Sequence, residues 1–115
     1  TLLKLSNVNV NYIVTSQETP HNIPKKIQLL ASWKQLLEKH DVDGVIIASP
    51  SETHYDIANA FMKKKIPVFI EKPMTLCVTK AQNLNNLEKK IKCPVVVDHI
   101  LLFSPACCQN KDINL

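Results

Sequence analysis

Val68-Phe69-Ile70-Glu71-Lys72-Pro73 is the stretch of this sequence that decides the fold. Its three apolar residues predict a short buried strand, which runs directly into a carboxylate, an ammonium group and a proline. Ligands bind open α/β sheets just beyond the carboxyl ends of the strands, so residues 71–73 stand where a ligand would lie. A lysine there can donate a proton or hold a developing alkoxide, and a proline fixes the turn that aims it. The alternative is a surface ion pair between Glu71 and Lys72, which would contribute roughly 0–1 kcal/mol.

Further strands and helices alternate on both sides of this stretch. Apolar runs predict strands at residues 8–14, 27–30, 44–48, 68–70 and 94–97. Capping-box spacings predict three helix starts: Ser32 with Gln35, Thr53 with Asp56, and Thr79 with Gln82. Alternating units of this kind form an α/β fold with a mostly parallel sheet and right-handed crossovers. The run 44–48 is continuously apolar, which predicts a strand buried on both faces.

Polar residues follow four of the predicted strands. The carboxyl ends of parallel strands meet at one edge of a sheet, which we call the carboxyl edge. We expect four segments to lie along it: Thr15 and Ser16, Ser49 and Pro50, residues 71–73, and Asp98 with His99. Loops are commonly polar for other reasons, and this alternative explains any one segment more easily than all four.

Two of these segments carry specific expectations. Backbone N–H groups of the helix that follows Ser49 and Pro50 could receive phosphate or ribose oxygens, although a plain helix-entry turn is the alternative. His54, in the first turn of that helix, either touches a ligand or hydrogen-bonds locally. Asp98 and His99 could form an acid/base pair, but adjacent strand residues point to opposite faces, so we expect only one to reach the edge.

The composition is typical of a single small globular domain, with 115 residues of which 45% are hydrophobic and 21% charged. No apolar run approaches the roughly 18 residues that span a bilayer, and the amino terminus shows no secretory signal. We therefore expect a cytoplasmic protein without membrane contact. The net charge of +4 comes from lysine clusters at predicted helix ends, without interleaved aromatic residues, so nucleic acid is not an expected partner.

The cysteines show neither a Cys-x-x-Cys spacing nor an accompanying His pair, which predicts no metal site. They are Cys77, Cys93, Cys107 and Cys108. Reduced thiols are expected, because a disulfide framework is typical of small secreted domains with little core.

Several of these segments together resemble the Gfo/Idh/MocA family, named for glucose-fructose oxidoreductase, inositol dehydrogenase and a rhizopine catabolism protein. The matching text, in the family's order, is DGVIIASPSETH at 43–54, VFIEKPMT at 68–75, VVVDH at 95–99 and FSPA at 103–106. The resemblance implies an enzyme with an N-terminal Rossmann domain that binds NAD or NADP. A C-terminal domain would shape the substrate pocket and the oligomer. The implied partner is a small sugar-like or cyclitol substrate, whose hydroxyl is oxidised or whose carbonyl is reduced.

The resemblance also implies roles for individual residues. Lys72 would be the catalytic residue and would contact the reacting hydroxyl, with Pro73 shaping its turn through a cis bond. The cofactor would be bound near its nicotinamide by Ser49, Pro50, His54, Glu71, Pro73 and His99. Thr15 or Ser16 stands where an acidic residue would hold the ribose 2′-hydroxyl, and these small side chains leave room for a 2′-phosphate. The choice between NAD and NADP therefore stays open.

The sequence departs from a complete Rossmann domain. Gly44 is its only glycine, so the first strand and the G-x-G-x-x-G turn that brings bare backbone to the pyrophosphate are absent. We expect residues 1–106 to form an incomplete Rossmann-like domain, a mostly parallel sheet flanked by helices. Residues 107–115 would begin a missing C-terminal domain or a loose tail.

Two functions remain open from the sequence. The first is a fragment of an NAD(P)-dependent oxidoreductase that, by itself, binds dinucleotide weakly or not at all and is inactive. The second is a non-catalytic Rossmann-like interaction module, because an incomplete sheet offers an unpaired face or edge for self-association or a partner. A homo-oligomer is compatible with both, and the substrate's identity stays undecided.

Overall fold

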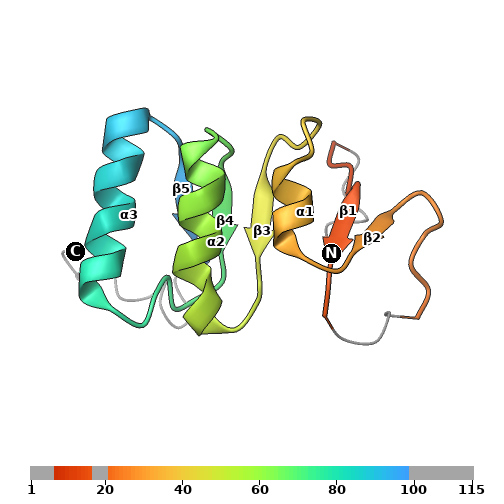
Figure 1. Ribbon diagram of the computed structural model, residues 1–115, viewed down its shortest axis with the longest axis horizontal. Helices are drawn as coiled ribbons and strands as arrows, with labels where there is room; N and C mark the ends of the chain where they lie inside the picture. Colours follow the sequence, from red (N-terminus) through yellow and green to blue (C-terminus); the bar gives the residue numbers. More distant parts are fainter. Residues whose placement is uncertain (1–6, 17–20, 99–115) are drawn as a thin grey trace, which may run out of the picture. The chain divides into compact units, whose positions relative to one another are not determined.

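The computed structural model describes residues 7–16 and 21–98 and divides the chain into two compact units, Thr1–Val42 and Asp43–Leu115 (Figure 1). Each unit is described by itself. The predictions that fall on residues 1–6, 17–20 and 99–115 lie outside the described residues. They include His99, the 103–106 motif and the tail from 107. The domain boundaries that the sequence suggests stay predictions.

The first unit contains two short parallel strands and a one-turn helix. Strand β1, Tyr12–Val14, pairs in register with β2, Gln28–Leu30, and helix α1, Trp33–Leu37, packs on both. The predicted strand 8–14 is therefore too long, because its only partner among the described residues is three residues in length. The predicted helix start at Ser32 is confirmed, since the Ser32 side chain accepts a hydrogen bond from the Lys34 N–H at 3.2 Å.

The second unit is a three-stranded parallel sheet with two crossover helices. The strands are β3, Val45–Ile47, β4, Val68–Ile70, and β5, Val95–Val97, paired in that order. Helix α2, Ser51–Lys63, joins β3 to β4, and helix α3, Val78–Ile91, joins β4 to β5. Across both units the order of strands and helices is the predicted one, and the α/β class is confirmed.

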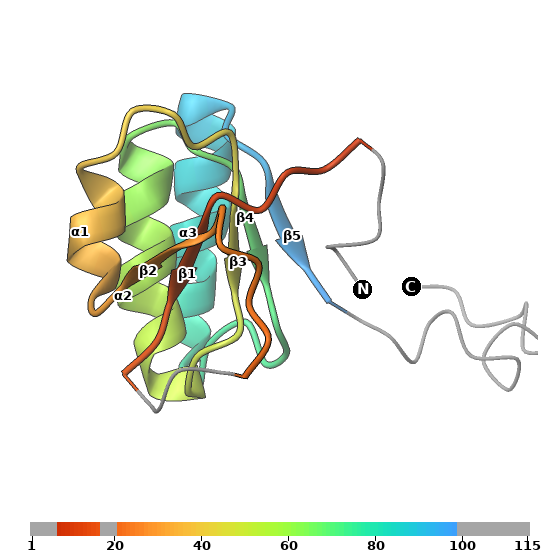
Figure 2. The ribbon, with the colours of Figure 1, turned by 90° about the vertical axis from the view of Figure 1, so that its right-hand side faces the viewer.

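The core of the second unit lies between its sheet and its helices. Both helices pack on the same side of the strands and against each other (Figure 2). The largest fully buried apolar side chains are Phe61, Met62, Ile70 and Leu84. Phe61 and Met62 are adjacent on α2, where apolar residues at helical spacing give the helix one buried side.

The prediction that the strands are buried on both faces is wrong for the described residues. Ile46 is 51% exposed, Phe69 38% and Val96 49%, while Ile47 and Ile70 are buried. Successive strand residues point to opposite faces, and the described helices of this unit cover only one of them. The exposed residues are aligned across the sheet, because Ile46 pairs with Phe69 and Phe69 with Val96. We call these three residues the open apolar row.

Two predicted helix starts are also wrong. Helix α2 begins at Ser51 with Pro50 as its N-cap, and α3 begins at Val78 with Cys77 as its N-cap. Thr53 and Thr79 therefore lie within the first turns. No helix in the described part of the chain is both long enough and apolar enough to span a bilayer.

Replacing Ile70 by alanine should lower the free energy of unfolding by about 2–5 kcal/mol, since the change leaves a cavity in a fully buried site. The matched control is Ile46→Ala in the neighbouring strand, where half of the side chain is exposed and no enclosed cavity forms. Urea denaturation of both variants measures the difference. Equal losses of unfolding free energy in the two variants would contradict a core that lies on one face of the sheet only.

Candidate functional site

The carboxyl edge of the second unit forms because its three strands end together. The parallel ladders are in register, with Ile47 opposite Ile70 and Ile70 opposite Val97. The ladder continues for one residue beyond the strands: the Glu71 N–H donates to the Ile47 carbonyl at 2.9 Å, and the Asp98 N–H to the Ile70 carbonyl at 2.8 Å. The polar residues that follow β3, β4 and β5, namely Ser49 and Pro50, residues 71–73, and Asp98, are therefore brought to one edge of this sheet, whereas the predicted place of Thr15, Ser16 and His99 on the same edge stays a prediction.

A pair of hydroxyl groups marks the turn between β3 and α2. Thr53 Oγ1 donates to the Pro50 carbonyl at 2.7 Å and lies 2.6 Å from Ser49 Oγ. Because the Thr53 proton is used on Pro50, the proton between the two hydroxyls comes from Ser49. Pro50 itself supplies no side-chain hydrogen bond to the helix end. The N-terminus of α2 is the positive end of the helix dipole, and it lies at the carboxyl edge beside the hydroxyl pair of Ser49 and Thr53.

His54 is buried beneath this turn, at 1% exposure. Its Nε2 lies 2.8 Å from the carbonyl oxygen of Ser49, and its Nδ1 lies 2.8 Å from the carbonyl oxygen of Pro73. The local hydrogen bonding that the sequence left open is thus present. Contact with a cofactor stays a prediction.

Lys72 and Pro73 are exposed in the turn that follows β4, and Glu71 is half-buried. The peptide bond between Lys72 and Pro73 is cis, as the family resemblance implied. Lys72 thus stands two residues beyond the end of β4, on the carboxyl edge of the second unit.

Thr15 and Ser16 belong to the first unit, directly after β1. The Thr15 N–H donates to the Leu30 carbonyl at 3.1 Å, which extends the ladder between β1 and β2 past the strand ends. Thr15 is half-buried and Ser16 is exposed. Their role at the cofactor ribose stays a prediction.

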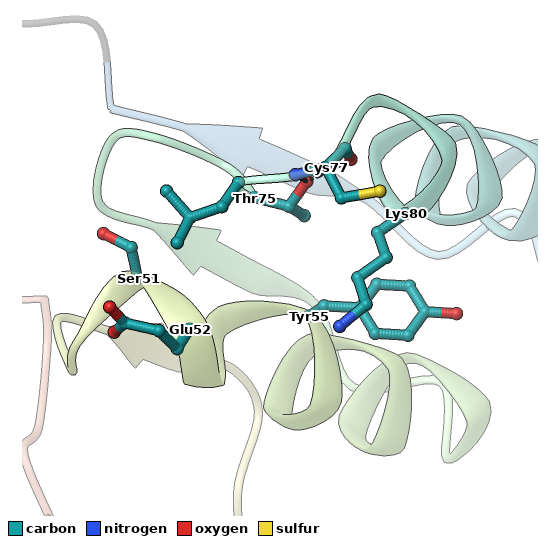
Figure 3. A pocket seen from close by; sticks show the side chains of 7 residues that line it. Ser51, Glu52, Tyr55, Thr75, Cys77 and Lys80 are labelled. Atoms are coloured by element: carbon teal, nitrogen blue, oxygen red, sulfur yellow. Dashed lines mark hydrogen bonds between the residues drawn. The ribbon is translucent and has the colours of Figure 1, made fainter.

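A shallow pocket of about 200 Å³, which no sequence motif indicated, lies between the first turns of α2 and α3 (Figure 3). Its lining includes Glu52, Tyr55, Cys77 and Lys80, and the Lys80 ammonium group lies 5.2 Å from the centre of the Tyr55 ring. The sequence did not indicate this pocket because the predicted helix began at Thr79, whereas the true N-cap is Cys77.

The thiol of Cys77 is electrostatically unusual for an exposed cysteine. The nearby backbone N–H groups of Lys80 and Thr79 in the first turn of α3 lower its pKa, and the Lys80 charge acts in the same direction. The buried Cys93 behaves in the opposite way, because burial and the nearby Glu88 carboxylate raise its pKa.

Comparison with known proteins identifies the family. The model of an oxidoreductase family with an NAD-binding Rossmann fold matches residues 13–99. The chain belongs to the Gfo/Idh/MocA oxidoreductase family. The family predicted from the sequence motifs is thereby confirmed. The matched residues begin within the first unit and extend into the second.

Curated members of the Gfo/Idh/MocA family align with most of this chain. Rhizopine catabolism protein MocA of Rhizobium meliloti is 29% identical over 67% of this chain and 24% of its own length. The inositol 2-dehydrogenase of an Arthrobacter species is 30% identical over 69% of this chain and 23% of its own length. The UDP-N-acetylglucosamine 3-dehydrogenase of Acidithiobacillus ferrooxidans is 32% identical over 57% of this chain and 21% of its own length. The chain thus spans about a quarter of these relatives.

A solved structure supports the same placement. A protein of Magnetospirillum magnetotacticum superposes with a TM-score of 0.84 at 27% identity, over 96% of this chain and 36% of its own length.

Cys77 should react with iodoacetamide faster than Cys93, because the thiolate is the nucleophile and only Cys77 is both exposed and lowered in pKa. The rate at Cys77 should persist at lower pH than for an ordinary thiol and fall as pH drops through its lowered pKa. Mass spectrometry of labelled peptides measures both rates in a background with Cys107 and Cys108 changed to serine.

Lys80→Ala is the matched control for this measurement. It removes the ammonium group but keeps the backbone N–H groups, which are the main cause of the lowered pKa, so the pH profile should move only slightly. A pH profile of Cys77 labelling like that of an unperturbed thiol would contradict the lowered pKa assigned to Cys77.

Proposed function

We propose that this chain supplies the cofactor-binding part of an NAD(P)-dependent dehydrogenase. The reaction would move a hydride between nicotinamide and the carbinol carbon of a sugar or cyclitol. The family match supports the dinucleotide, and the relatives include proteins named as an inositol 2-dehydrogenase and a UDP-N-acetylglucosamine 3-dehydrogenase. The observation that carries the proposal is the exposed Lys72 on the carboxyl edge, the edge at which α2 also begins.

The residues of this edge fit one portion of a dinucleotide. The N-terminus of α2 and the Ser49–Thr53 hydroxyl pair suit the oxygens of a phosphate or ribose, and we assign the nicotinamide-ribose side to them. With Gly44 as the only glycine, these 115 residues contain no glycine-rich turn for the pyrophosphate. The chain alone therefore provides part of the contacts that hold the cofactor.

Lys72 carries the proton chemistry in this proposal. A bound nicotinamide dinucleotide supplies the hydride acceptor or donor. Lys72 holds the substrate oxygen through its Nζ atom. As an amine it takes the hydroxyl proton during oxidation, and as an ammonium group it returns the proton to the carbonyl oxygen during reduction. Glu71 and Pro73, on either side of Lys72, complete the turn that presents it.

The proposal keeps both NAD and NADP as cofactors. The small side chains of Thr15 and Ser16 leave room for a 2′-phosphate, and the sequence contains no arginine to bind one. The location of the protein is proposed to be cytoplasmic, where reduced thiols such as those of Cys77 and Cys93 persist.

The second candidate is a non-catalytic interaction module, and the open apolar row favours it. Ile46, Phe69 and Val96 expose three aligned apolar side chains on one face of the sheet. An aligned apolar surface of this kind favours association with another protein surface. Under this alternative Lys72 is a solvated cation with no role in chemistry.

Dinucleotide binding by the 115-residue chain should be weaker than micromolar for both NADH and NADPH. The reason is that these 115 residues contain no glycine-rich turn to bind the pyrophosphate. Fluorescence titration and isothermal calorimetry measure the affinity. Micromolar affinity for either cofactor would show that these residues suffice for the site.

The catalytic role is tested in a chimera in which residues 13–99 replace the matching segment of the Arthrobacter inositol 2-dehydrogenase. Lys72→Ala should lower kcat/KM for inositol oxidation by about 10²–10⁴-fold, which is the usual contribution of a positioned acid or base. Nicotinamide absorbance follows the reaction. The matched control is Lys63→Ala at the other end of α2, which should leave the rate unchanged.

An active chimera whose rate is the same with and without the Lys72 side chain would contradict the catalytic role. That outcome would favour the interaction module, in which Lys72 has no substrate to hold.

A further inference from the structure

His54 is the only buried polar or charged side chain among the described residues. It lies in the first turn of α2, directly inside the carboxyl edge. Burying a polar ring has a free-energy cost unless its nitrogens find partners. A histidine buried at this place therefore needs polar partners, and two backbone carbonyl oxygens lie within hydrogen-bond distance of its ring nitrogens.

The two partners of the ring are backbone carbonyls from different segments. The Ser49 carbonyl follows β3, and the Pro73 carbonyl follows β4, and each lies 2.8 Å from a ring nitrogen. Pro73 is 19 residues from His54 along the chain. The ring therefore bridges two turns of the carboxyl edge that no strand pairing joins at this point.

The bridge is rigid, because the two nitrogens are held in one planar ring. Carbonyl oxygens only accept hydrogen bonds, so a ring with hydrogen on one nitrogen donates to one turn at a time, and a doubly protonated ring donates to both. Both contacts are hydrogen bonds only in the doubly protonated ring, because a nitrogen without hydrogen would repel the carbonyl oxygen that it faces at 2.8 Å. With both nitrogens directed at backbone and 1% of the residue exposed, the ring is occupied by this contact.

We propose that His54 is a positioning residue: its ring ties the Pro73 carbonyl to the Ser49 carbonyl and so determines where the preceding Lys72 lies on the carboxyl edge. The effect on catalysis rests on the proposed function of Lys72, whereas the tie between the two turns does not. In this proposal His54 acts through the backbone, and its effect on Lys72 needs no contact with substrate or cofactor.

Two substitutions separate this role from simple filling of space. His54→Gln places one amide nitrogen near the position of Nε2, where it can donate to the Ser49 carbonyl but not to the Pro73 carbonyl as well. His54→Phe keeps the buried volume and removes both donors. The matched control is Ile57→Val, which trims a buried apolar residue on the same helix without touching either carbonyl.

The primary readout is amide hydrogen exchange in the intact 115-residue chain, measured by NMR without cofactor. His54→Phe should speed exchange at the Glu71 amide, which donates to the Ile47 carbonyl at the start of this turn, about tenfold or more relative to the amides of α3. His54→Gln, which keeps a donor for one carbonyl only, should also lose protection, and Ile57→Val should leave it unchanged. Exchange at the Glu71 amide that is the same in His54→Phe and in Ile57→Val would overturn the proposal.

A second readout needs no variant, so a His54→Phe protein that fails to fold does not prevent a decision. The long-range proton–nitrogen spectrum of the wild-type chain should show a His54 ring N–H that exchanges slowly with water, unlike the ring N–H signals of the exposed His21 and His40. A His54 ring that exchanges as fast as these two would overturn the tie.

The chimera connects the tie to catalysis. His54→Phe should lower kcat more than it weakens dinucleotide binding, because loss of the tie displaces Lys72 and leaves the cofactor contacts in place. If Lys72→Ala has no effect on the rate, the proposed function fails while the exchange result still stands. If Lys72 is essential and His54→Phe leaves both kcat and exchange unchanged, the positioning role alone fails.

Discussion

Parallel, in-register pairing of β3, β4 and β5 is the constraint on which the candidate site depends. Each strand is three residues long, so a shift of one residue would change which side chains meet at the ends. The hydrogen bonds from Glu71 and Asp98 to the preceding strands extend this pairing into the turns. The positions of Lys72 and of the α2 N-terminus thus follow from backbone pairing, and His54 adds a side-chain tie between two of the same turns.

The two faces of this sheet differ in what covers them. Ile47 and Ile70 are buried in the strands that α2 packs against, whereas the open apolar row is only partly covered by the described residues. The chain spans about a quarter of the length of the curated relatives that it matches. The open apolar row and Lys72 favour different functions, and both lie on the one sheet.

Much of the fold could be predicted from local pattern. The apolar runs at 44–48, 68–70 and 94–97 correspond to β3, β4 and β5, and the order of helices and strands is the predicted one. The helix starts were less predictable. Thr53 has the spacing of an N-cap, but its hydroxyl bonds back to Pro50 inside a turn that has already begun, and Cys77 caps α3 without any capping-box signal. Capping boxes indicate the neighbourhood of a helix end better than its first residue.

The sequence by itself determined the strands, the alternation with helices and the family motif around Lys72, because side-chain period and motif spacing are local properties of the chain. Only the tertiary structure decided which face of each strand is covered and where the His54 nitrogens are directed. Every residue carries a backbone carbonyl, so the amino-acid sequence does not indicate that the Pro73 carbonyl, 19 residues away, is the partner of His54. That choice is made by packing, which brings the turn after β4 over the first turn of α2.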